Sequence, residues 1–307
     1  MTEIAAPAGA EWARRSGILG GCLCGAVRYR LIGMMAQPTA CHCHMCRRHH
    51  GALGVFVGAR RQTFELQGAE HILWYPSSPE AERGSCKICG SKLFWRQKDG
   101  DAMDATTGSL DRQSGLELRA HIWVDHRGDY ETIMDDVPKF SASMQGEGER
   151  QPIAAAPMAT SGNAATSDRH AGGCLCGTIR FEVAGPLRDA VMCHCAQCRH
   201  WHGDAAVYAA TDLDSVTIQD ETALVWYQTS SRTRRGFCAK CGACMFWQHL
   251  REGQPAGQIS VSVGALDAPT GLRVTRHLFI NDQAVTFRLI ETSNPSTGIW
   301  SPGQIAF

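Results

Sequence analysis

Fourteen of the fifteen cysteines follow a spacing that occurs twice along the chain. Each occurrence consists of a CxC pair, then a CxCxxC run, then a CxxC pair. Thiolates separated by one or two residues can turn toward one ion, and a CxxC followed by glycine is a common half of a zinc site. Glycines beside the CxC pair allow the backbone to bend there. The cysteine spacing therefore predicts metal binding in both occurrences.

Seven thiols per occurrence divide most naturally into a group of four and a group of three. The CxC and CxxC pairs would form closed, structural four-thiolate sites, with the ligands Cys22, Cys24, Cys86 and Cys89, and then Cys174, Cys176, Cys238 and Cys241. The CxCxxC run would hold a second ion and leave one position open for water or a substrate, as catalytic zinc sites do. These catalytic sites would use Cys41, Cys43 and Cys46, and then Cys193, Cys195 and Cys198. We expect up to four zinc ions per chain, two in each occurrence.

An alternative is that both ions are structural and that a histidine closes the second site. The candidates near the CxCxxC runs are His42, His44, His49, His50, His194, His200 and His202. Of these, the pairs at equivalent positions are His42 with His194 and His50 with His202, and a further pair is His121 with His277. The spacing alone leaves this alternative open.

The blocks around the cysteines show that the chain is a duplication. GGCLCGAVRY recurs as GGCLCGTIRF, CHCHMCRRHHG as CHCAQCRHWHG, and RGSCKICGSKLFW as RGFCAKCGACMFW, all at an offset of 152 residues. The offset is 156 for TTGSLD and SVGALD, so four residues are gained after the second CxxC. We expect a first domain at 17–140 and a second at 169–307. Between them, 141–168 is rich in small residues and is expected to be a flexible linker.

Short runs of β-branched and aromatic residues between turn residues predict a mostly β fold in each copy. In the first copy these runs are AVRYRLI, LGVFVGA, HILWY, KLFW and HIWV. The corresponding runs of the second copy are TIRFEV, AAVYAA, ALVWY, MFW and HLFI. One turn of helix is expected around CRRHHG and CRHWHG. The recurring tryptophans and tyrosines, such as Trp95 and Trp247, are expected to pack the small cores.

Composition narrows the class of protein. Lys plus Arg equals Asp plus Glu, giving a formal net charge of zero, so a nucleic-acid partner is not expected. The N-terminal residues show no apolar stretch typical of an export signal, and no segment resembles a membrane span. We therefore expect a cytoplasmic protein whose thiols stay reduced and bind metal. Cys244 has no counterpart in the first copy and is expected to be a free thiol.

The blocks GGCLCGAVRY, CHCHMCRRHHG, CKICGSKLFW, TGSLD and HIWV resemble the signature of the glutathione-dependent formaldehyde-activating enzyme family, which also includes centromere protein V. The resemblance covers nearly all of 17–140 and most of 169–281. It implies two tandem zinc-containing β-tent domains, zinc-ribbon-related and complex β-barrel-like. It also implies a structural zinc on the CxC and CxxC pairs and a catalytic zinc on the CxCxxC run. The implied reaction is that of S-(hydroxymethyl)glutathione synthase, a carbon–sulfur lyase acting on glutathione and formaldehyde.

This resemblance suggests a mechanism in which glutathione binds through its sulfur at the three-cysteine ion and attacks formaldehyde. Arg47 and Arg199 could balance the charge of the site or bind a glutathione carboxylate, and His50 and His202 could move a proton. The two domains could pack as an intramolecular pseudo-dimer. The competing hypothesis is a non-catalytic interaction module that uses zinc only to fold. Access of a substrate thiol to the three-cysteine ion separates the two hypotheses.

Overall fold

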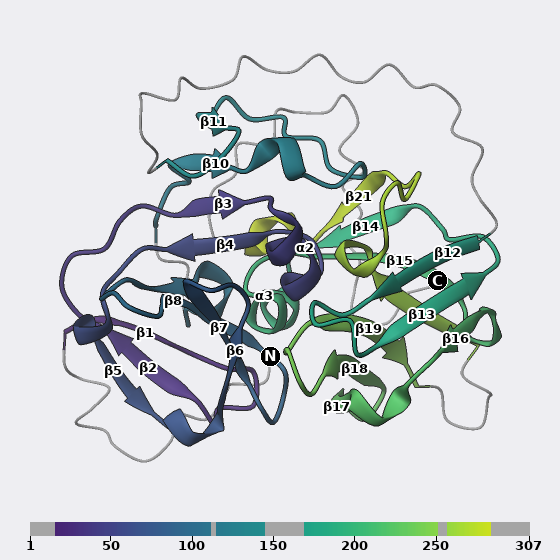
Figure 1. Ribbon diagram of the computed structural model, residues 1–307, viewed down its shortest axis with the longest axis horizontal. Coiled ribbons are helices and arrows are strands. Elements are labelled where there is room, and N and C mark those ends of the chain that lie inside the picture. Colours follow the sequence, from purple (N-terminus) through teal and green to yellow (C-terminus); the bar gives the residue numbers. More distant parts are fainter. Residues whose placement is uncertain (1–15, 112–114, 145–168, 251–256, 284–307) are drawn as a thin grey trace.

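The structure is a computed structural model that describes residues 16–111, 115–144, 169–250 and 257–283. These residues form two β-rich halves, each with one short helix, in agreement with the predicted fold class. Figure 1 shows the first copy in purple to teal and the second in green to yellow, with the two helices near their junction. Residues 1–15, most of the predicted linker and the C-terminal segment from residue 284 lie outside the described residues.

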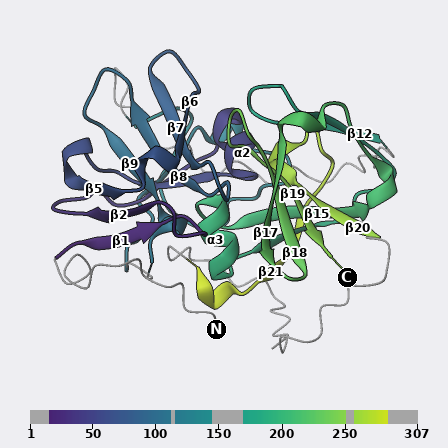
Figure 2. The same cartoon turned by 90° about the horizontal axis from the view of Figure 1, so that it is seen from below.

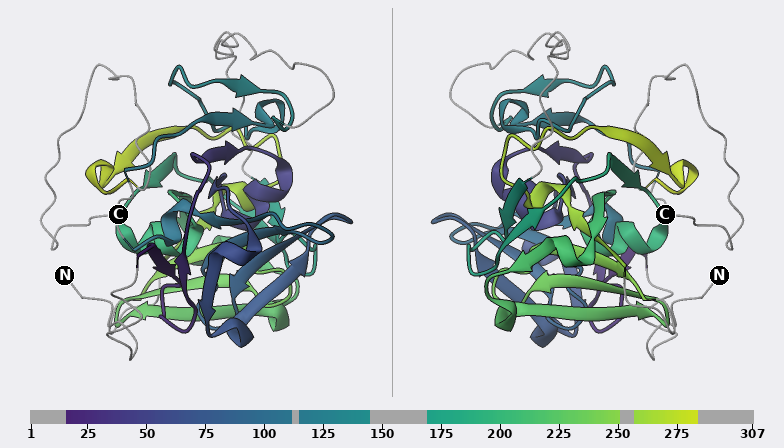
Figure 3. Two further views of the ribbon diagram at one scale, coloured as in Figure 1. Left: turned by 90° about the vertical axis from the view of Figure 1, so that its left-hand side faces the viewer. Right: turned by 90° about the vertical axis from the view of Figure 1, so that its right-hand side faces the viewer.

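The first copy contains two open sheets. The smaller one joins three antiparallel strands in the order β1 (Ile18–Gly21), β2 (Arg28–Leu31) and β5 (Phe64–Gln67). The larger one has the order β11 (Lys139–Phe140), β10 (Ala120–Ile122), β3 (Thr39–Cys41), β4 (Gly54–Val57), β9 (Met103–Thr106), β8 (Lys92–Gln97), β7 (Ala81–Cys86) and β6 (Ile72–Pro76). Figure 3 shows β10 and β11, in teal, at one end of the molecule. Over the described residues neither sheet closes into a barrel.

The second copy repeats this arrangement. Its small sheet has the order β12 (Arg169–Gly173), β13 (Arg180–Ala184) and β16 (Val216–Ile218). Its large sheet has the order β17 (Leu224–Ser230), β18 (Thr233–Cys238), β19 (Cys244–His249), β20 (Gln258–Ser262), β15 (Ala206–Asp212), β14 (Ala190–Cys193) and β21 (Val274–Leu278). In both copies the strand before the CxCxxC run pairs in parallel with a strand from the end of the domain. That long-range pairing has no local sequence signal.

The two helices follow directly from the CxCxxC runs and are longer than the single turn expected. Helix α2 spans His44–His50 and α3 spans Ala196–His202. Cys43 caps α2, because its Sγ accepts a hydrogen bond from the Cys46 amide at 3.4 Å. Both helices end at a glycine with a φ of 86°, Gly51 and Gly203, a backbone conformation that favours glycine. No helix among the described residues is long and apolar enough to cross a membrane.

Most predicted strands lie where expected, but two of them end early. HIWV and HLFI were expected to be extended throughout, whereas β10 ends at Ile122 and β21 at Leu278. The next residue in each case, Trp123 or Phe279, has a positive φ, 58° and 55°, and begins a 3-10 turn. A strand cannot continue through this left-handed backbone conformation. The apolar pattern alone could not show the change.

Each helix packs against a tight turn of the other copy, as Figures 1 and 2 show. Helix α3 meets the 3-10 turn Thr107–Ser109, where the Gly108 amide donates to the Gly203 carbonyl at 2.7 Å. Helix α2 meets Val263–Ala265 in the same way, and the Gly264 amide donates to the Gly51 carbonyl at 2.8 Å. A Cβ at Gly108 or Gly264 would collide with backbone atoms of the opposing helix end. The recurring TGSLD and VGALD blocks therefore serve the contact between the copies.

The buried junction between the copies contains both hydrogen bonds and apolar contacts. Trp201 of α3 is fully buried, and its Nε1 donates to the Cys89 carbonyl of the first copy at 2.6 Å. Arg48 of α2 donates to the Gly173 and Ala265 carbonyls at 2.8 and 2.6 Å. The main hydrophobic cluster also includes side chains of both copies. The two halves thus share part of their interior.

The last residues of the two helices form reciprocal hydrogen bonds at the centre of the junction. His50 Nδ1 donates to the His202 carbonyl at 2.7 Å, and His202 Nδ1 donates to the His50 carbonyl at 2.5 Å. Both nitrogens must carry the proton, because a carbonyl can only accept. Burial lowers the pKa of His50 to about 4 and that of His202 to about 3. Both rings are therefore neutral at physiological pH.

Acid is expected to destabilise the folded chain through these two histidines. In the unfolded chain each ring binds a proton below a pH of about 6.5, whereas in the folded chain it stays neutral until the pH approaches the lowered pKa. The free energy of unfolding should therefore fall as the pH drops from about 6.5 toward about 4, by about 2 kcal/mol per histidine at about pH 5. Urea unfolding at about pH 7 and about pH 5 measures this loss.

The variant His50→Asn isolates the contribution of one ring, because the amide can still donate but does not titrate. It should lose less stability between the two pH values than the unchanged chain. His71→Asn replaces a half-exposed histidine away from the junction and should behave as the unchanged chain does. An equal loss in all three proteins would contradict the prediction.

Candidate metal centres

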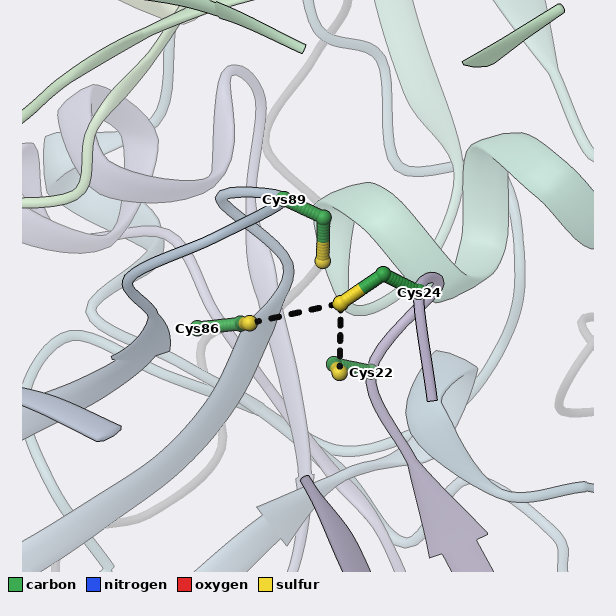
Figure 4. A group of neighbouring side chains, drawn as sticks. All are labelled: Cys22, Cys24, Cys86 and Cys89. Atoms are coloured by element: carbon green, nitrogen blue, oxygen red, sulfur yellow. Dashed lines mark hydrogen bonds between the residues drawn. The ribbon is translucent and has the colours of Figure 1, made fainter. Parts of the chain in front are cut away.

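The first closed cluster consists of Cys22, Cys24, Cys86 and Cys89, whose sulfur atoms all lie within 4.8 Å of one another. Figure 4 shows the four sulfurs converging on one point, two from the loop after β1 and two from the hairpin after β7. Cys24 Sγ lies 3.4 Å from Cys22 Sγ and 3.8 Å from Cys86 Sγ. A zinc ion with bonds of about 2.3 Å to four thiolates separates the sulfurs by roughly 3.8 Å. The spacing therefore fits a tetrahedral zinc ion.

Local backbone bonds hold these thiols in place. The Val27 amide donates to Cys22 Sγ at 3.2 Å, and the Gly90 amide donates to the Cys86 carbonyl at 2.9 Å. Ser91 connects the two chain segments, because its Oγ accepts from the Leu23 amide at 2.9 Å and lies 3.2 Å from Cys89 Sγ. The cluster thus ties the start of the copy to its β7–β8 hairpin.

The second closed cluster repeats the first, with Cys174, Cys176, Cys238 and Cys241. Cys176 Sγ lies 3.4 Å from Cys174 Sγ and 3.9 Å from Cys238 Sγ. The Ile179 amide donates to Cys174 Sγ at 3.2 Å, as Val27 does to Cys22. Hydrogen bonds from Cys238 and Cys241 lower the pKa of Cys174 to about 2, so this thiol is readily ionised. Both closed clusters have the four-thiolate composition of structural zinc.

The three remaining cysteines of each copy form a separate group. We call Cys41, Cys43 and Cys46 the first open site, and Cys193, Cys195 and Cys198 the second open site. In the described part of the chain no histidine or carboxylate joins either group at ligand distance. In each site the strand end supplies one thiol and the start of the helix supplies the others. The arrangement can hold a metal through three thiolates and leave a fourth direction to another ligand.

A buried arginine contacts each open site, and sequence reasoning did not identify it. Arg83 Nη2 donates to Cys46 Sγ at 3.3 Å, and Arg235 Nη2 donates to Cys198 Sγ at 3.5 Å. Both arginines are almost completely buried, at 3% and 1% exposure. They occupy equivalent positions on β7 and β18, so their recurrence at the offset of 152 residues was the available signal.

These guanidinium groups favour the thiolate form of the sulfurs beside them. Hydrogen bonds from Cys41 and Cys43 hold the pKa of Cys46 well below its usual value, and the charge of Arg83 lowers it further. The pKa of Cys198 is lowered in the same way by Cys193 and Cys195, with Arg235 adding to the effect. A three-thiolate zinc site carries a net negative charge, which a buried cation offsets.

Arg47 and Arg199, the arginines singled out from the sequence, directly follow the last cysteine of each open site on α2 and α3. Both are buried, and Arg199 Nε donates to the His194 carbonyl at 3.2 Å. Arg47 lies beside Tyr130 and Glu131, whose pKa values respond to its charge. In the described contacts, the guanidinium that reaches a sulfur of each open site is that of Arg83 or Arg235.

His42 and His121 form part of a buried chain of titratable groups behind the first open site. His42 Nε2 lies 2.9 Å from His121 Nδ1, and His42 Nδ1 lies 2.8 Å from Glu131 Oε1. His121 Nε2 in turn lies 3.0 Å from Asp135 Oδ2. The two carboxylates come from a segment without a clear pattern, so the sequence reading missed them. This chain braces the CxCxxC strand against the end of the copy.

The second copy has only the histidine pair of this chain among its described residues. His194 Nε2 lies 3.1 Å from His277 Nδ1, and the two rings are stacked. Burial lowers the pKa of His194 to about 4. The positions of the second copy that correspond to Glu131 and Asp135 lie beyond residue 283, outside the described residues.

Recurring tryptophans of the first copy pack as predicted, and one of them also lines the first open site. Trp95 and Phe56 lie against the cysteines of the first open site. Trp74 stacks on Phe94 with ring centroids 5.9 Å apart. Cys244 is fully buried, packs with Trp201 and Phe237, and belongs to none of the four cysteine groups.

Comparison with known proteins identifies the relationship of the chain. The family model described as glutathione-dependent formaldehyde-activating enzyme matches residues 17–126 and 169–282. The two matched segments agree with a tandem duplication and together cover most of the chain.

Individual relatives are distant. A Halomonas elongata protein that carries the name of this family is 28% identical over 127 residues, which are 37% of this chain and 79% of that protein. An uncharacterised lyase of Schizosaccharomyces pombe is 30% identical over 81 residues, which are 26% of this chain and 58% of that protein. The crystal structure of a Rhodobacter sphaeroides protein is similar at 27% identity and a TM-score of 0.28, covering 34% of this chain and 99% of that one.

The two kinds of cysteine group should respond differently to mutation. Cys86→Ser is expected to lower the melting temperature by roughly 10 °C, because a structural ion contributes its binding free energy to folding. Cys43→Ser should have a much smaller effect, since the open site lies on an already folded framework. Thermal unfolding followed by circular dichroism measures both changes.

Cys244→Ser is the matched control, because it removes a buried thiol that lies outside the cysteine groups. It should resemble Cys43→Ser and not Cys86→Ser. Equal losses in Cys86→Ser and Cys43→Ser would mean that the open site is also structural.

Proposed function

Because the chain belongs to the glutathione-dependent formaldehyde-activating enzyme family, we propose that it is a zinc-dependent carbon–sulfur lyase-type enzyme. Its proposed substrates are glutathione and formaldehyde, or a related adduct of a thiol and an aldehyde. The reaction would be the one catalysed by S-(hydroxymethyl)glutathione synthase. The single observation that carries the proposal is the open three-thiolate group with a buried arginine against one of its sulfurs, present in each copy.

Four zinc ions per chain are part of the proposal. The closed clusters would hold one ion each through four thiolates, and the open sites would hold one each through three. The sulfur spacing of 3.4 to 3.9 Å in the closed clusters supports zinc, as does the all-thiolate ligand set. At an open site, zinc would supply the positive charge that keeps a fourth, substrate thiol ionised at neutral pH.

The protein's own groups would then control charge and protons around the substrate. Arg83 and Arg235 offset the negative charge of the thiolates and can donate to oxygen as negative charge develops on it. His50 uses Nδ1 for the bond to the other copy, so Nε2 is the atom at which it can accept a proton. Its pKa of about 4 keeps this nitrogen unprotonated at neutral pH. Attack of the thiolate on the aldehyde carbon would form the carbon–sulfur bond and break the carbon–oxygen π bond, and the oxygen would take up the proton that the substrate thiol had released.

Two further expectations remain proposals. The reciprocal bonds between the helices support an intramolecular pseudo-dimer, in which each copy completes the interior of the other. All fifteen cysteines are free thiols in the structure, which supports a reducing compartment such as the cytoplasm.

Zinc content tests the metal part of the proposal. Freshly purified chain prepared without chelator should contain close to four zinc ions by elemental analysis. Mild chelation should remove the two open-site ions first, because they have fewer protein ligands. Fewer than about one ion per chain in untreated protein would refute the metal assignment.

Thiol binding tests the catalytic part. Glutathione should stabilise the zinc-loaded chain by about 2.7 kcal/mol at a hundredfold excess over its dissociation constant. S-methylglutathione keeps the peptide contacts but has no ionisable thiol, so it should stabilise far less. Thermal shift measures both, and any rate with formaldehyde must be corrected for the uncatalysed addition. Equal shifts would exclude binding through sulfur, and the absence of any shift would favour a non-catalytic interaction module.

A further inference from the structure

The two open sites have different surroundings although their cysteines are equivalent. Tyr208 of the second copy occupies the position of Phe56 in the first, and Gln197 occupies that of Met45. Phe56 packs against the cysteines of the first open site. The second site thus has polar groups where the first has apolar ones.

Strand register places Tyr208 beside the second open site. On β14 and β15, Cys193 pairs with Ala206 and Val191 pairs with Tyr208. Cys193 and Tyr208 are therefore diagonal neighbours on one face of the sheet, a separation that a tyrosine side chain can span. Tyr208 is partly exposed as a residue, and its hydroxyl is the buried end of the side chain.

A chain of hydrogen bonds runs from the junction of the copies to the second open site. His202 Nε2 lies 2.7 Å from Tyr208 Oη, Arg235 Nη1 donates to Tyr208 Oη at 3.4 Å, and Arg235 Nη2 contacts Cys198 Sγ. Arg235 Nη2 is also held by Gln197 Oε1 at 3.2 Å. In the first copy the equivalent arginine, Arg83, donates from Nη1 to the Ser77 hydroxyl instead. Phe56 packs against the His50 ring and has no hydroxyl.

The direction of every bond in this chain follows from the donors. His202 Nδ1 donates to the His50 carbonyl, so the neutral ring leaves Nε2 as an acceptor and the Tyr208 hydroxyl must donate to it. Arginine can only donate, so Tyr208 Oη accepts from Arg235. A hydroxyl oxygen has two lone pairs, and one of them is left to accept from a ligand.

From this geometry we propose that Tyr208 is a specificity-determining residue, which makes the affinity for thiohemiacetals, relative to that for simple thiols, higher at the second open site than at the first. The free lone pair of its hydroxyl would accept a hydrogen bond from the hydroxyl of an S-hydroxyalkyl group whose sulfur lies at the cysteines. The first open site, with Phe56 in this place, would not offer this hydrogen bond. The inference rests on the proposed function and concerns which form of the substrate each copy prefers.

The test compares ligand affinity at each site in the zinc-loaded full chain. Cys43→Ser leaves the second open site and Cys195→Ser leaves the first. Calorimetry then gives the Kd of glutathione alone and of glutathione with excess formaldehyde, which forms the hydroxymethyl adduct, with formaldehyde alone as the blank. The ratio of the two affinities should favour the adduct about tenfold more at the second site than at the first, the value of one net hydrogen bond.

Reciprocal substitutions assign the difference to one hydroxyl. Y208F in the Cys43→Ser chain should weaken binding of the adduct about tenfold more than binding of glutathione, whereas F56Y in the Cys195→Ser chain should strengthen binding of the adduct relative to glutathione. Tyr227→Phe, on β17, is the matched control and should change neither value. If the serine variants do not fold, the same ratio is measured on the otherwise unchanged chain with Y208F and with F56Y.

The outcomes separate this inference from the proposed function. Equal ratios at the two sites, or an equal loss of affinity for both ligands in Y208F, would overturn the role of Tyr208 while leaving thiol binding intact. Failure of both ligands to bind at either site would overturn the proposed function and, with it, this inference.

Discussion

Four groups of cysteine thiols have to converge on common centres, and the rest of each copy is built around this constraint. Sulfur atoms 3.4 to 3.9 Å apart in the closed clusters repel one another once they ionise, so a cation between them would stabilise the arrangement. Each closed cluster joins the first strand of a copy to a hairpin more than 60 residues later. Small β domains with few large apolar side chains gain much of their stability from such links.

The second constraint is the close approach of the copies. Glycines at the 3-10 turns let each helix end press against the backbone of the other copy, and the two histidines that end the helices bond to each other's carbonyls. Trp201 extends this coupling to a closed cluster, because it donates to the carbonyl of Cys89. Cysteines of an open site and of a closed cluster in different copies are therefore connected through a short, buried path. The copies also share part of their interior, since the main hydrophobic cluster contains residues of both.

Duplication has allowed the two open sites to diverge without losing their shared core. The sulfur ligands and the contacting arginines are kept in both, which preserves charge balance at the thiolates. The surroundings differ: the first site has an apolar wall and a carboxylate-linked histidine pair behind it, and the second has a polar chain that ends at the junction. Similar metal chemistry with different substrate contacts is a common result of duplication, because the ligands and the pocket walls are separate residues.

The sequence by itself determined the duplication, the β class and the division of the cysteines into fours and threes. These features are local, because one or two residues separate the cysteines of each pair and short apolar runs predict the strands. Only the tertiary structure decided which arginine contacts an open site, because Arg83 and Cys46 are 37 residues apart and no spacing rule connects them. The same holds for the parallel pairing of β3 with β10 and for the bonds between His50 and His202, 152 residues apart. Contacts of this kind depend on how whole sheets and helices pack, which a linear pattern does not contain.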